Sequence, residues 1–389
     1  MHICFLCNEY PKEGFPHGGI GTFVKTIALQ LVKSGVAVSV VGVNYENKYE
    51  EVVENGVYIY RIERHQIKGL SWFLNFRNIN KCLKRIHQKV VIDIVETSEL
   101  GLAFIHKIPN IKYIIRLHGG HHFFAEAERR GIDKWKGFQE KKSFKKADAF
   151  VAVSEYVKKH TELYLDFNNK SVAIINNPIN FSLFKPSENP KQIKHRLVFV
   201  GTVCEKKGVR QLLEAFQEVR LNYIDATLDI YGRDWFYPDG RSYIAELQKM
   251  FTQLQMDKIR FMGTVAHNNL PNIYESANVC VFPSHIETQG LVAPEAMAME
   301  KAVIFSKTGP GPETITDGET GFLVDPYNSK EIAEKIMRCF KNGEAVQQIG
   351  KNARIAAIDK FAINMILEKN IEFYKKLLKN KPSDKIADL

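Results

Sequence analysis

At 389 residues the chain is too long for one ordinary hydrophobic core, so two domains of similar size are expected. Hydrophobic residues make up 45% and charged residues 25% of the sequence, the composition of a soluble globular protein, and no apolar run is long enough to span a bilayer. The formal net charge of +10 favours anionic partners such as nucleotide phosphates or lipid headgroups. Nucleic acid is not expected, because no nucleic-acid-binding pattern accompanies the charge.

The N-terminal segment predicts the opening unit of a doubly wound α/β sheet. A strand over 2–7 leads into a polar loop with three glycines at 18–21, then a helix over about 22–35 and a strand over 36–43. The glycines lack the Gly-x-Gly-x-x-Gly spacing of dinucleotide-binding loops, so no nicotinamide or flavin cofactor is expected. Three glycines within four positions favour a substrate-facing loop over a plain turn. The N-terminus carries no basic leader, which predicts a cytoplasmic protein.

Polar residues follow the next predicted strands of the first half. Strands are expected over 57–63 and 90–95, and Glu96 and Glu99 come directly after the second. They would lie at the carboxyl edge of the sheet, where open α/β sheets bind ligands.

Three histidines follow the predicted strand over 113–117. They suggest a metal site, but His121 and His122 are adjacent and no carboxylate has ligand spacing, so no metal is expected. We interpret His118 as a cleft residue and the other two as flanking polar groups.

A basic segment stands out between Lys134 and Lys146. It holds six lysines against one glutamate, interleaved with Trp135, Phe138 and Phe144. Such a run is either a solvated helix face or a contact with an anionic membrane surface, and the sequence leaves both open.

The second half repeats the plan of the first. Polar, proline-containing sequence over 180–195 is the predicted linker. A strand over 197–201 then runs into a loop ending at Gly208, and a helix follows. Further strands are predicted over 227–231, 259–262, 279–282 and 301–305. Two Rossmann-like halves of this kind would face each other across a cleft, a preferred place for a ligand.

Residues 282–295 carry the strongest signal for chemistry. Gly290 permits close backbone approach, and Pro294 fits only the first turn of a helix. The amides of residues 290–292 (Gly290, Leu291 and Val292) would therefore form an anion site at a helix N-terminus, flanked by Glu287 and Glu295. A phosphate between two hydroxyl-rich groups suits such a site, and a nucleotide-sugar is a ligand of that form.

The Glu-x7-Glu spacing, followed by Ala-Met-Ala-Met, resembles the donor-binding motif of the family 4 retaining glycosyltransferases, which have the GT-B fold. Further stretches are similar to family motifs: 199–208, 147–155, 177–180, 270–274 and 309–313. The resemblance implies an acceptor-binding domain over 1–185, completed by a C-terminal helix over about 362–379 that crosses back to it. A donor-binding domain would cover 195–360.

The resemblance also implies roles for single residues. Lys207 would contact the donor pyrophosphate, Glu295 the ribose and Glu287 the sugar hydroxyls. Gly19 would let the first-domain loop approach the donor, and His118 would sit beside the sugar near the reacting carbon. Gly201, Thr202 and the amides of 290–292 would complete the donor site, with Glu96 and Glu99 on the acceptor side. The chain has no Asp-x-Asp sequence, the family works without a metal, and no cofactor is expected.

Two positions depart from the family pattern. Thr202 stands where an arginine usually follows the glycine at the end of the strand, so Lys206 or Arg210 would have to supply the missing cation. Gln289 replaces an aromatic residue in the loop that lines the sugar pocket, which leaves the identity of the sugar open.

The resemblance therefore implies a retaining hexosyltransferase. It would move a sugar from a nucleotide-sugar to a glycan or lipid-linked acceptor in cell-surface polysaccharide or lipopolysaccharide biosynthesis. We expect the donor to be a UDP-sugar. It would act in the cytoplasm, with peripheral attachment to the inner face of the membrane as an option. A nucleotide-sugar epimerase, a sugar phosphorylase of similar fold and a non-catalytic nucleotide-sugar-binding protein remain as alternatives.

Overall fold

A computed structural model describes residues 1–15, 18–128 and 131–379, and the chain divides into two compact units. Unit 1 comprises Met1–Pro178 and Asn364–Leu389, and unit 2 comprises Ile179–Ile363. Each unit is an α/β structure built on its own, mainly parallel sheet, the two-domain class that the sequence predicts. The segment 180–195, interpreted above as a linker, belongs to unit 2.

The sheet of unit 1 has the strand order β3-β4-β2-β1-β5-β6-β7-β8, and only the β3–β4 hairpin is antiparallel. Its central strands are almost completely buried, as expected for a parallel sheet covered on both faces. The strands are β1 (His2–Leu6), β2 (Ala37–Val43), β3 (Glu50–Glu54), β4 (Val57–Ile62), β5 (Ile94–Thr97), β6 (Lys112–Leu117), β7 (Ala149–Ala152) and β8 (Val172–Ile174).

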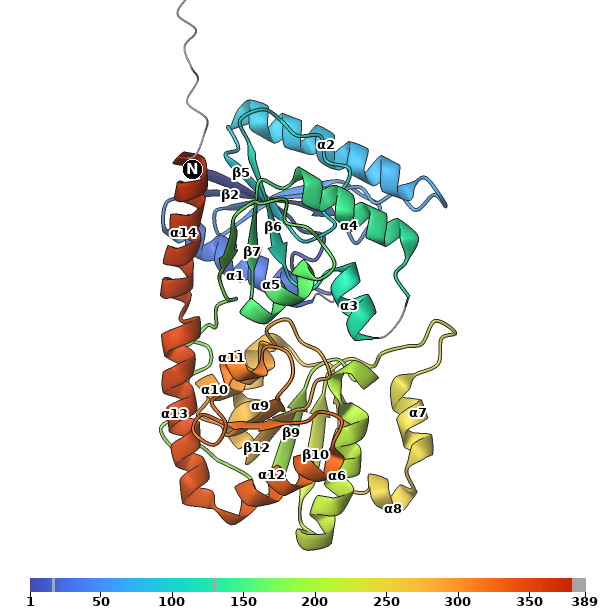
Figure 1. Ribbon diagram of the computed structural model, residues 1–389, viewed down its shortest axis with the longest axis vertical. Coiled ribbons are helices and arrows are strands. Elements are labelled where there is room, and N and C mark those ends of the chain that lie inside the picture. Colours follow the sequence, from blue (N-terminus) through green and yellow to red (C-terminus); the bar gives the residue numbers. More distant parts are fainter. Residues whose placement is uncertain (16–17, 129–130, 380–389) are drawn as a thin grey trace, which may run out of the picture. The chain divides into compact units, whose positions relative to one another are not determined.

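Helices cover both faces of this sheet. Helix α1 contributes Ile27 and Leu31 to one buried face, and the C-terminal helix α14 contributes Ile366 and Tyr374 to the same hydrophobic cluster. Helices α2 and α4 lie next to each other in Figure 1 and meet through Trp72 and Trp135, whose ring centroids are 5.3 Å apart. The helices of this unit are α1 (Gly19–Lys33), α2 (Ser71–Lys89), α3 (His121–Ala127), α4 (Lys134–Lys146), α5 (Glu155–Glu162) and α14 (Ile363–Lys379).

A buried polar network fastens α14 to the sheet. The Arg116 side chain on β6 is 1% exposed and donates from Nε to Glu96 Oε1 at 2.6 Å and from Nη2 to the Asn370 side chain. The Tyr374 hydroxyl donates to the other oxygen of Glu96 at 2.7 Å. A buried charge pair is tolerated only when its remaining polar atoms are satisfied, and α14 supplies those partners. The last helix of the chain is therefore part of unit 1, as the resemblance implied.

The sheet of unit 2 is parallel throughout, with the order β11-β10-β9-β12-β13-β14. The chain runs outward from β9 in one direction, then returns and runs outward from β12 in the other. The topological switch point, where ligands bind in open α/β sheets, therefore lies between β9 and β12. The strands are β9 (Arg196–Val200), β10 (Thr227–Tyr231), β11 (Ile259–Gly263), β12 (Val279–Phe282), β13 (Val303–Ser306) and β14 (Phe322–Val324).

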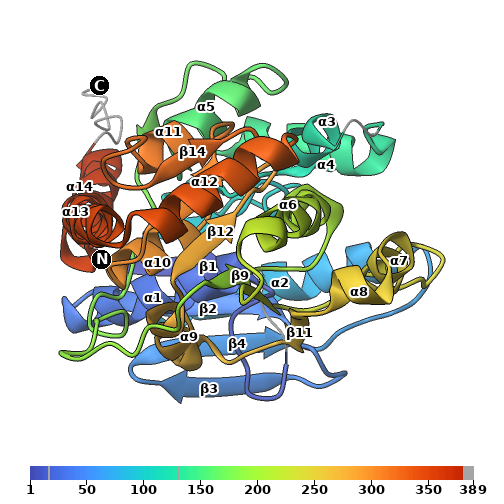
Figure 2. The same cartoon turned by 90° about the horizontal axis from the view of Figure 1, so that it is seen from below.

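The long helices α6 and α12 of unit 2 are amphipathic, and their buried residues, among them Leu212 and Ile336, belong to the hydrophobic core of this unit. Helix α6 packs beside α12, as Figure 2 shows, and α10 packs beside α13. The helical segments are η1 (Glu205–Lys207), α6 (Val209–Asn222), α7 (Tyr243–Met250), α8 (Gln253–Met256), η2 (His267–Asn269), α9 (Leu270–Ser276), α10 (Val292–Ala298), α11 (Gly311–Thr314), α12 (Ser329–Lys341) and α13 (Gly343–Phe361).

Candidate active site

Two loops leave the sheet of unit 2 at its switch point, and they carry most of the predicted donor residues. The loop after β9 spans 201–208, and the loop after β12 spans 283–291. Gly208 has φ +68°, and a Cβ there would lie 1.9 Å from the carbonyl oxygen of Pro283. The His285 amide also donates to the carbonyl of Lys206 at 2.9 Å. The glycine therefore allows the two loops to pack backbone against backbone.

This packing brings Lys207 and Glu287 together as an ion pair. The Lys207 side chain is 23% exposed and that of Glu287 is 12% exposed, so the pair is shielded but can be reached. Ser284 Oγ donates to Glu287 Oε1 at 2.9 Å and holds the carboxylate. A diphosphate that enters here would compete with Glu287 for the ammonium group, and Glu287 would then be free to accept hydrogen bonds from hydroxyls.

The amides predicted to bind an anion lie at the start of α10. Gly290 has φ +72°, and a Cβ there would lie 2.8 Å from the Phe305 ring, so this position favours glycine. Ala293 and Glu295 donate their amides to the carbonyls of Gly290 and Leu291. Within the described residues, the amides of Gly290, Leu291 and Val292 are not used by another protein group.

Glu295 is held in place by two residues that the sequence analysis did not assign. Its carboxylate is 5% exposed, lies 2.9 Å from His267 Nε2 and accepts from the Tyr274 hydroxyl at 3.3 Å. Burial alone would lower the pKa of His267, but the hydrogen bond and the charge of Glu295 raise it. Burial, with the same charge, raises the pKa of Tyr274 well above its usual value. Tyr274 belongs to the recognised stretch 270–274, but its link to Glu295 was not foreseen.

One of the two expected replacements for the missing arginine, Arg210, is less suitable than predicted. Arg210 pairs with Glu205 at 2.7 Å and Glu214 at 2.8 Å. It would have to abandon two carboxylates to bind a phosphate. Thr202 is half-buried beside Gly201, and Gln289 is 2% exposed.

Gly19 is the first residue of α1 and is exposed. A Cβ at Gly19 would meet nothing within 4 Å, whereas at Gly21 it would lie 1.9 Å from the Glu9 carbonyl oxygen. Packing therefore explains Gly21 but not Gly19, whose role in approach to the donor stays a prediction. The helix begins three residues before the predicted Thr22.

His118 follows β6 and is half-buried, with its ring 5.3 Å from that of Phe23. Burial, together with the positive charge of Arg116, lowers the pKa of His118 to about 3. The imidazole is therefore neutral at physiological pH, and it can donate one hydrogen bond and accept another.

The two glutamates assigned to the acceptor side differ in their surroundings. Both oxygens of Glu96 are occupied by Arg116 and Tyr374 in the network that holds α14. Glu96 is 2% exposed and is unavailable to an acceptor, so we correct its assignment to a structural one. Glu99 is also buried, but its Oε1 has no hydrogen-bond partner among the described residues. Burial and the nearby charge of Glu140 raise the pKa of Glu99 to about 8.

His121 and His122 are buried and belong to the packing of α3 on α4. The Glu140 carboxylate, which is fully buried, accepts from the amides of both residues at 2.9 Å and also contacts His122 Nδ1. A Cβ at Gly120 would lie 1.6 Å from Glu140 Oε1, so the glycine makes room for this contact. Among residues 1–15, 18–128 and 131–379, no His, Cys, Asp and Glu cluster is arranged to hold a metal ion.

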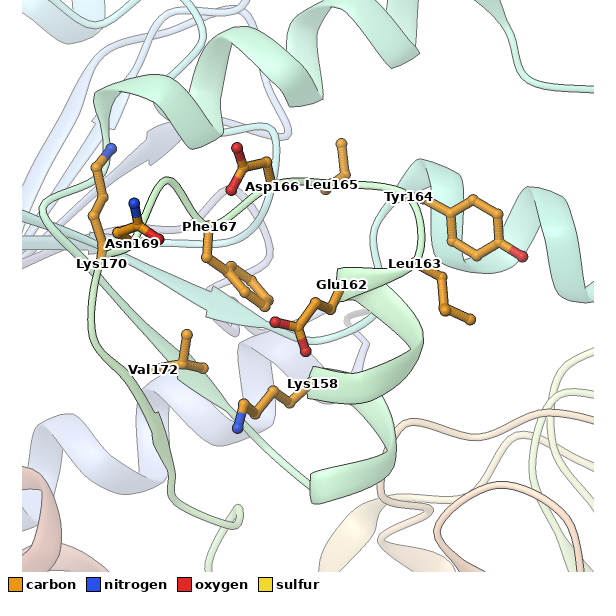
Figure 3. A pocket seen from close by; sticks show the side chains of 10 residues that line it. All are labelled: Lys158, Glu162, Leu163, Tyr164, Leu165, Asp166, Phe167, Asn169, Lys170 and Val172. Carbon is orange, nitrogen blue, oxygen red and sulfur yellow. The ribbon is translucent and has the colours of Figure 1, made fainter.

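A pocket of about 610 Å³ lies elsewhere in unit 1, between α5 and β8 (Figure 3). Its walls come from 158–172, the segment that leads into the amino end of β8. In Figure 3, Phe167, Glu162 and Lys158 turn toward its interior and Tyr164 points away. None of the predicted site residues lines this pocket, so its size does not make it the active site.

The lysine run forms α4, and its side chains have two different surroundings. Trp135 and Phe138 are 45% and 51% exposed, but Phe144 is 1% exposed and belongs to the core, so it is not part of a membrane contact. Lys146 donates to the carbonyls of Ala103 and Ile105. The exposed lysines are Lys134, Lys136, Lys141 and Lys145. No helix in the described part of the chain has the length and apolar character needed to cross a membrane.

Comparison with known proteins shows the family of the chain. The family Glycosyltransferase Family 4 matches residues 17–183, and Glycosyl transferases group 1 matches residues 181–356. An uncharacterised glycosyltransferase of Methanocaldococcus jannaschii is 23% identical over 88% of this chain and 91% of its own length. The capsular polysaccharide biosynthesis glycosyltransferase CapM of Staphylococcus aureus is 28% identical over 60% of this chain and 63% of its own length.

Solved structures resemble the whole chain. The sucrose-phosphate synthase of Thermosynechococcus elongatus has a TM-score of 0.84 at 22% identity, covering 98% of this chain and 100% of that one. HepE of Anabaena, solved in complex with UDP-glucose, has a TM-score of 0.76 at 18% identity, covering 97% and 100%. Two family matches that together span residues 17–356, on a fold shared over the whole chain, show that this protein belongs to the family 4 glycosyltransferases and has the GT-B fold.

Proposed function

We propose that the protein is a retaining hexosyltransferase that uses a UDP-sugar and extends a glycan or lipid-linked acceptor of a cell-surface polysaccharide or lipopolysaccharide. The observation that carries the proposal is the arrangement at the switch point of unit 2. There a shielded lysine, Lys207, is held against Glu287, and Glu295 is fixed nearby by His267 and Tyr274. A cation for phosphate and two carboxylates for hydroxyls are the groups that a nucleotide-sugar requires.

The donor class is supported by the relatives. HepE was solved with UDP and with UDP-glucose, and its fold covers 97% of this chain. CapM is named for capsular polysaccharide biosynthesis. The choice of hexose depends on the loop that contains Gln289.

The proposed reaction is a same-face displacement. The bond between the anomeric carbon and the donor phosphate oxygen breaks, and the nucleoside diphosphate keeps the electron pair. The acceptor hydroxyl attacks from the same side, its oxygen forms the new glycosidic bond, and its proton passes to the departing phosphate. Lys207 and the amides of residues 290–292 would stabilise the negative charge that develops on the diphosphate. We expect no metal requirement.

On the acceptor side, unit 1 offers neutral polar groups. His118 is neutral at physiological pH, and the Glu99 carboxyl is mostly protonated below pH 8. Neutral donors and acceptors suit sugar hydroxyls, which carry no charge. We propose that His118 lies beside the transferred sugar and that Glu99 contacts the acceptor.

The experiment that tests this function measures donor binding and turnover together. A UDP-sugar at about 100 times its Kd should raise the free energy of unfolding by about 2.7 kcal/mol, which is visible as a thermal shift. The correct donor should also release UDP slowly without acceptor, because water is a poor substitute nucleophile, and EDTA should not abolish the release. Interconversion of the sugar without UDP release would indicate an epimerase, and phosphate-dependent turnover a phosphorylase. Binding without turnover, even with added cell-envelope lipids, would indicate a binding protein.

We also propose that α4 contacts the inner face of the membrane, where a lipid-linked acceptor would be found. The exposed lysines of α4 accompany Trp135 and Phe138, and a groove of about 560 Å³ lined by Trp72, Phe76 and Phe104 adjoins them. Each basic residue near an anionic leaflet contributes about 1 kcal/mol, and the aromatic rings add apolar contact that salt does not screen.

This contact predicts co-sedimentation with anionic vesicles, partial release in high salt and no binding to neutral vesicles. Changing Lys134, Lys136, Lys141 and Lys145 to Glu should abolish the sedimentation and leave UDP-sugar binding unchanged. A matched control changes four exposed lysines of unit 2, Lys249, Lys330, Lys341 and Lys351, and should still sediment. If the α4 variant sediments like the wild type, α4 is only a solvated helix.

A further inference from the structure

Two cations of the donor site described above, Lys207 and Arg210, are already paired with carboxylates. Thr202 occupies the position where the family resemblance predicts an arginine, and Arg210 is held by Glu205 and Glu214. Lys207 is itself paired with Glu287. A diphosphate carries several negative oxygens, so a second cation near Thr202 would have an evident use.

The strand register places another arginine next to Thr202. Strands β9 and β10 pair in parallel with a constant offset, from Arg196 with Thr227 to Val200 with Tyr231. The same offset appears beyond the strands, in the bridge between Val203 and Asp234. Between these pairs, Thr202 is matched with Arg233.

The backbone supports this match at each step. The Gly201 amide donates to the Tyr231 carbonyl at 2.9 Å, and the Val203 amide donates to the Arg233 carbonyl at 2.9 Å. Gly201 and Gly232, which precede the matched residues, have nearly identical φ angles of 151° and 149°. The chain therefore leaves β9 and β10 through glycines of nearly the same φ angle. Register partners on parallel strands stand about 5 Å apart on the same face of the sheet, within the length of an arginine side chain.

Arg233 is also uncommitted. It is exposed, and no ion pair or side-chain hydrogen bond is recorded for it with any residue in the described ranges. By contrast, Arg241 in the same connection pairs with Asp239 at 2.8 Å. Arg196 and Arg260, on the neighbouring strands, both pair with Asp229.

We propose that Arg233 binds the donor diphosphate and supplies, from the neighbouring strand, the charge that an arginine at position 202 would provide. The proposal rests on the proposed function and specifies its donor site further. The guanidinium would donate to the phosphate oxygens while Lys207 approaches the same group from the loop 201–208. Because negative charge grows on the diphosphate as the bond to the sugar breaks, Arg233 would contribute to turnover as well as to binding.

The test compares UDP with uridine, which shares the base and ribose but has no phosphate. Arg233→Gln should weaken UDP binding about ten- to a hundredfold, the effect of losing a hydrogen bond between charged groups, and leave uridine binding unchanged. Arg241→Gln is the matched control, because it removes another exposed arginine from the same connection, and its UDP affinity should stay within threefold. Arg233→Gln should unfold at the wild-type temperature, since Arg233 has no side-chain partner to lose among the residues that the structure describes.

A transposition tests the position as well as the charge. The double variant Thr202→Arg with Arg233→Thr moves the guanidinium to the matched residue, and it should recover at least half of the lost binding free energy. Unchanged UDP affinity in Arg233→Gln would overturn the proposal, and so would equal losses for UDP and uridine. If the double variant folds but does not recover UDP affinity, the placement of Arg233 beside Thr202 is wrong. If the wild type binds neither UDP nor GDP, the proposed function itself fails; if it binds UDP and Arg233→Gln binds it equally, only this inference fails.

Discussion

The two units share one plan, a mainly parallel sheet with polar residues after the carboxyl ends of its strands, but they differ in the charge state of these residues. In unit 2 the groups are ionic: Lys207 faces Glu287, and Glu295 faces His267. In unit 1 they are neutral at physiological pH, because His118 has a pKa of about 3 and Glu99 a pKa of about 8. Unit 1 also has a buried ionic pair, Glu96 with Arg116, which lies inside the core and supports α14.

The difference shows that surroundings decide what a polar residue can do. Glu96, Glu99, Glu287 and Glu295 are the same residue type, but Glu96 holds a helix, the pKa of Glu99 is raised to about 8, and Glu287 and Glu295 face Lys207 and His267. A diphosphate needs fixed cations, whereas an acceptor hydroxyl needs uncharged partners. The ionic site of unit 2 and the neutral groups of unit 1 match those two needs.

The largest effect is expected from a substitution that breaks the buried Glu96–Arg116 pair of unit 1. Arg116→Leu would leave Glu96 buried without a counter-charge and should cost about 3–5 kcal/mol in the free energy of unfolding, measured by urea denaturation. Replacing both residues by Leu should cost less, because no uncompensated charge remains. Arg77→Leu, at an exposed position of the same unit, is the control. A loss below about 1 kcal/mol would mean that Glu96 is not held by the pairing described here.

The next effect concerns the ionic site of unit 2. Lys207→Ala should lower turnover of the correct donor about 10²–10³-fold, the cost of removing one electrostatic stabiliser of the leaving group. Stability should change little, because the side chain is partly exposed. Lys249→Ala, at an exposed position of α7, should keep wild-type turnover. A decrease of less than about threefold would move the role to another cation, with Arg233 the first to be examined.

The smallest effect tests the neutral character of Glu99. The folded pKa of about 8 lies above the usual value of 4.5, so the folded protein binds a proton that the unfolded chain has released. The resulting stability is fully present below pH 4.5 and is lost as the pH rises to about 8, by at most about 1.4 kcal/mol per pH unit.

As the pH rises from 6 to 8, the wild type should therefore lose about 1–3 kcal/mol of unfolding free energy that Glu99→Gln, which has no carboxyl group at this position, does not lose. Glu63→Gln, at an exposed position in the same unit, should follow the wild type across this range. A pH-independent difference between Glu99→Gln and the wild type would show that Glu99 is already ionised at pH 6.

Much of the fold could be predicted from the sequence, since buried parallel strands are short apolar runs. The strands over 227–231 and 279–282 agree with β10 and β12 residue for residue. Strands β8 and β14 were not predicted because they have only three residues each, and β3 was not because its two valines stand among three glutamates. The strand predicted over 90–95 begins at Ile94, since Val90 and Val91 are apolar but exposed. The strand begins where β5 starts to pair with β1, at Ile94, and the apolar character of residues 90–95 does not reveal that point.

The candidate site could be predicted only in part. Motifs located Lys207, Glu287 and Glu295 in the chain, but their partners lie far from them in sequence, so the pairs Lys207–Glu287 and His267–Glu295 were not visible. Glu96 was assigned to the acceptor side because its partner Tyr374 stands 278 positions away. The sequence also did not indicate Arg233, because only the pairing of β9 with β10 matches it with Thr202.

The network that fastens α14 also has a consequence for the order in which the protein is made. Unit 2 is one uninterrupted stretch, Ile179–Ile363, whereas unit 1 needs Asn370 and Tyr374 from the end of the chain to satisfy Arg116 and Glu96. Domains generally fold as units during synthesis, N-terminal first, but here the first unit to be translated is the last to be completed. Until α14 has been synthesised, Arg116 and Glu96 pair with each other without Asn370 and Tyr374, and the apolar surface that α14 covers stays exposed, a stage at which chaperones would find a binding surface.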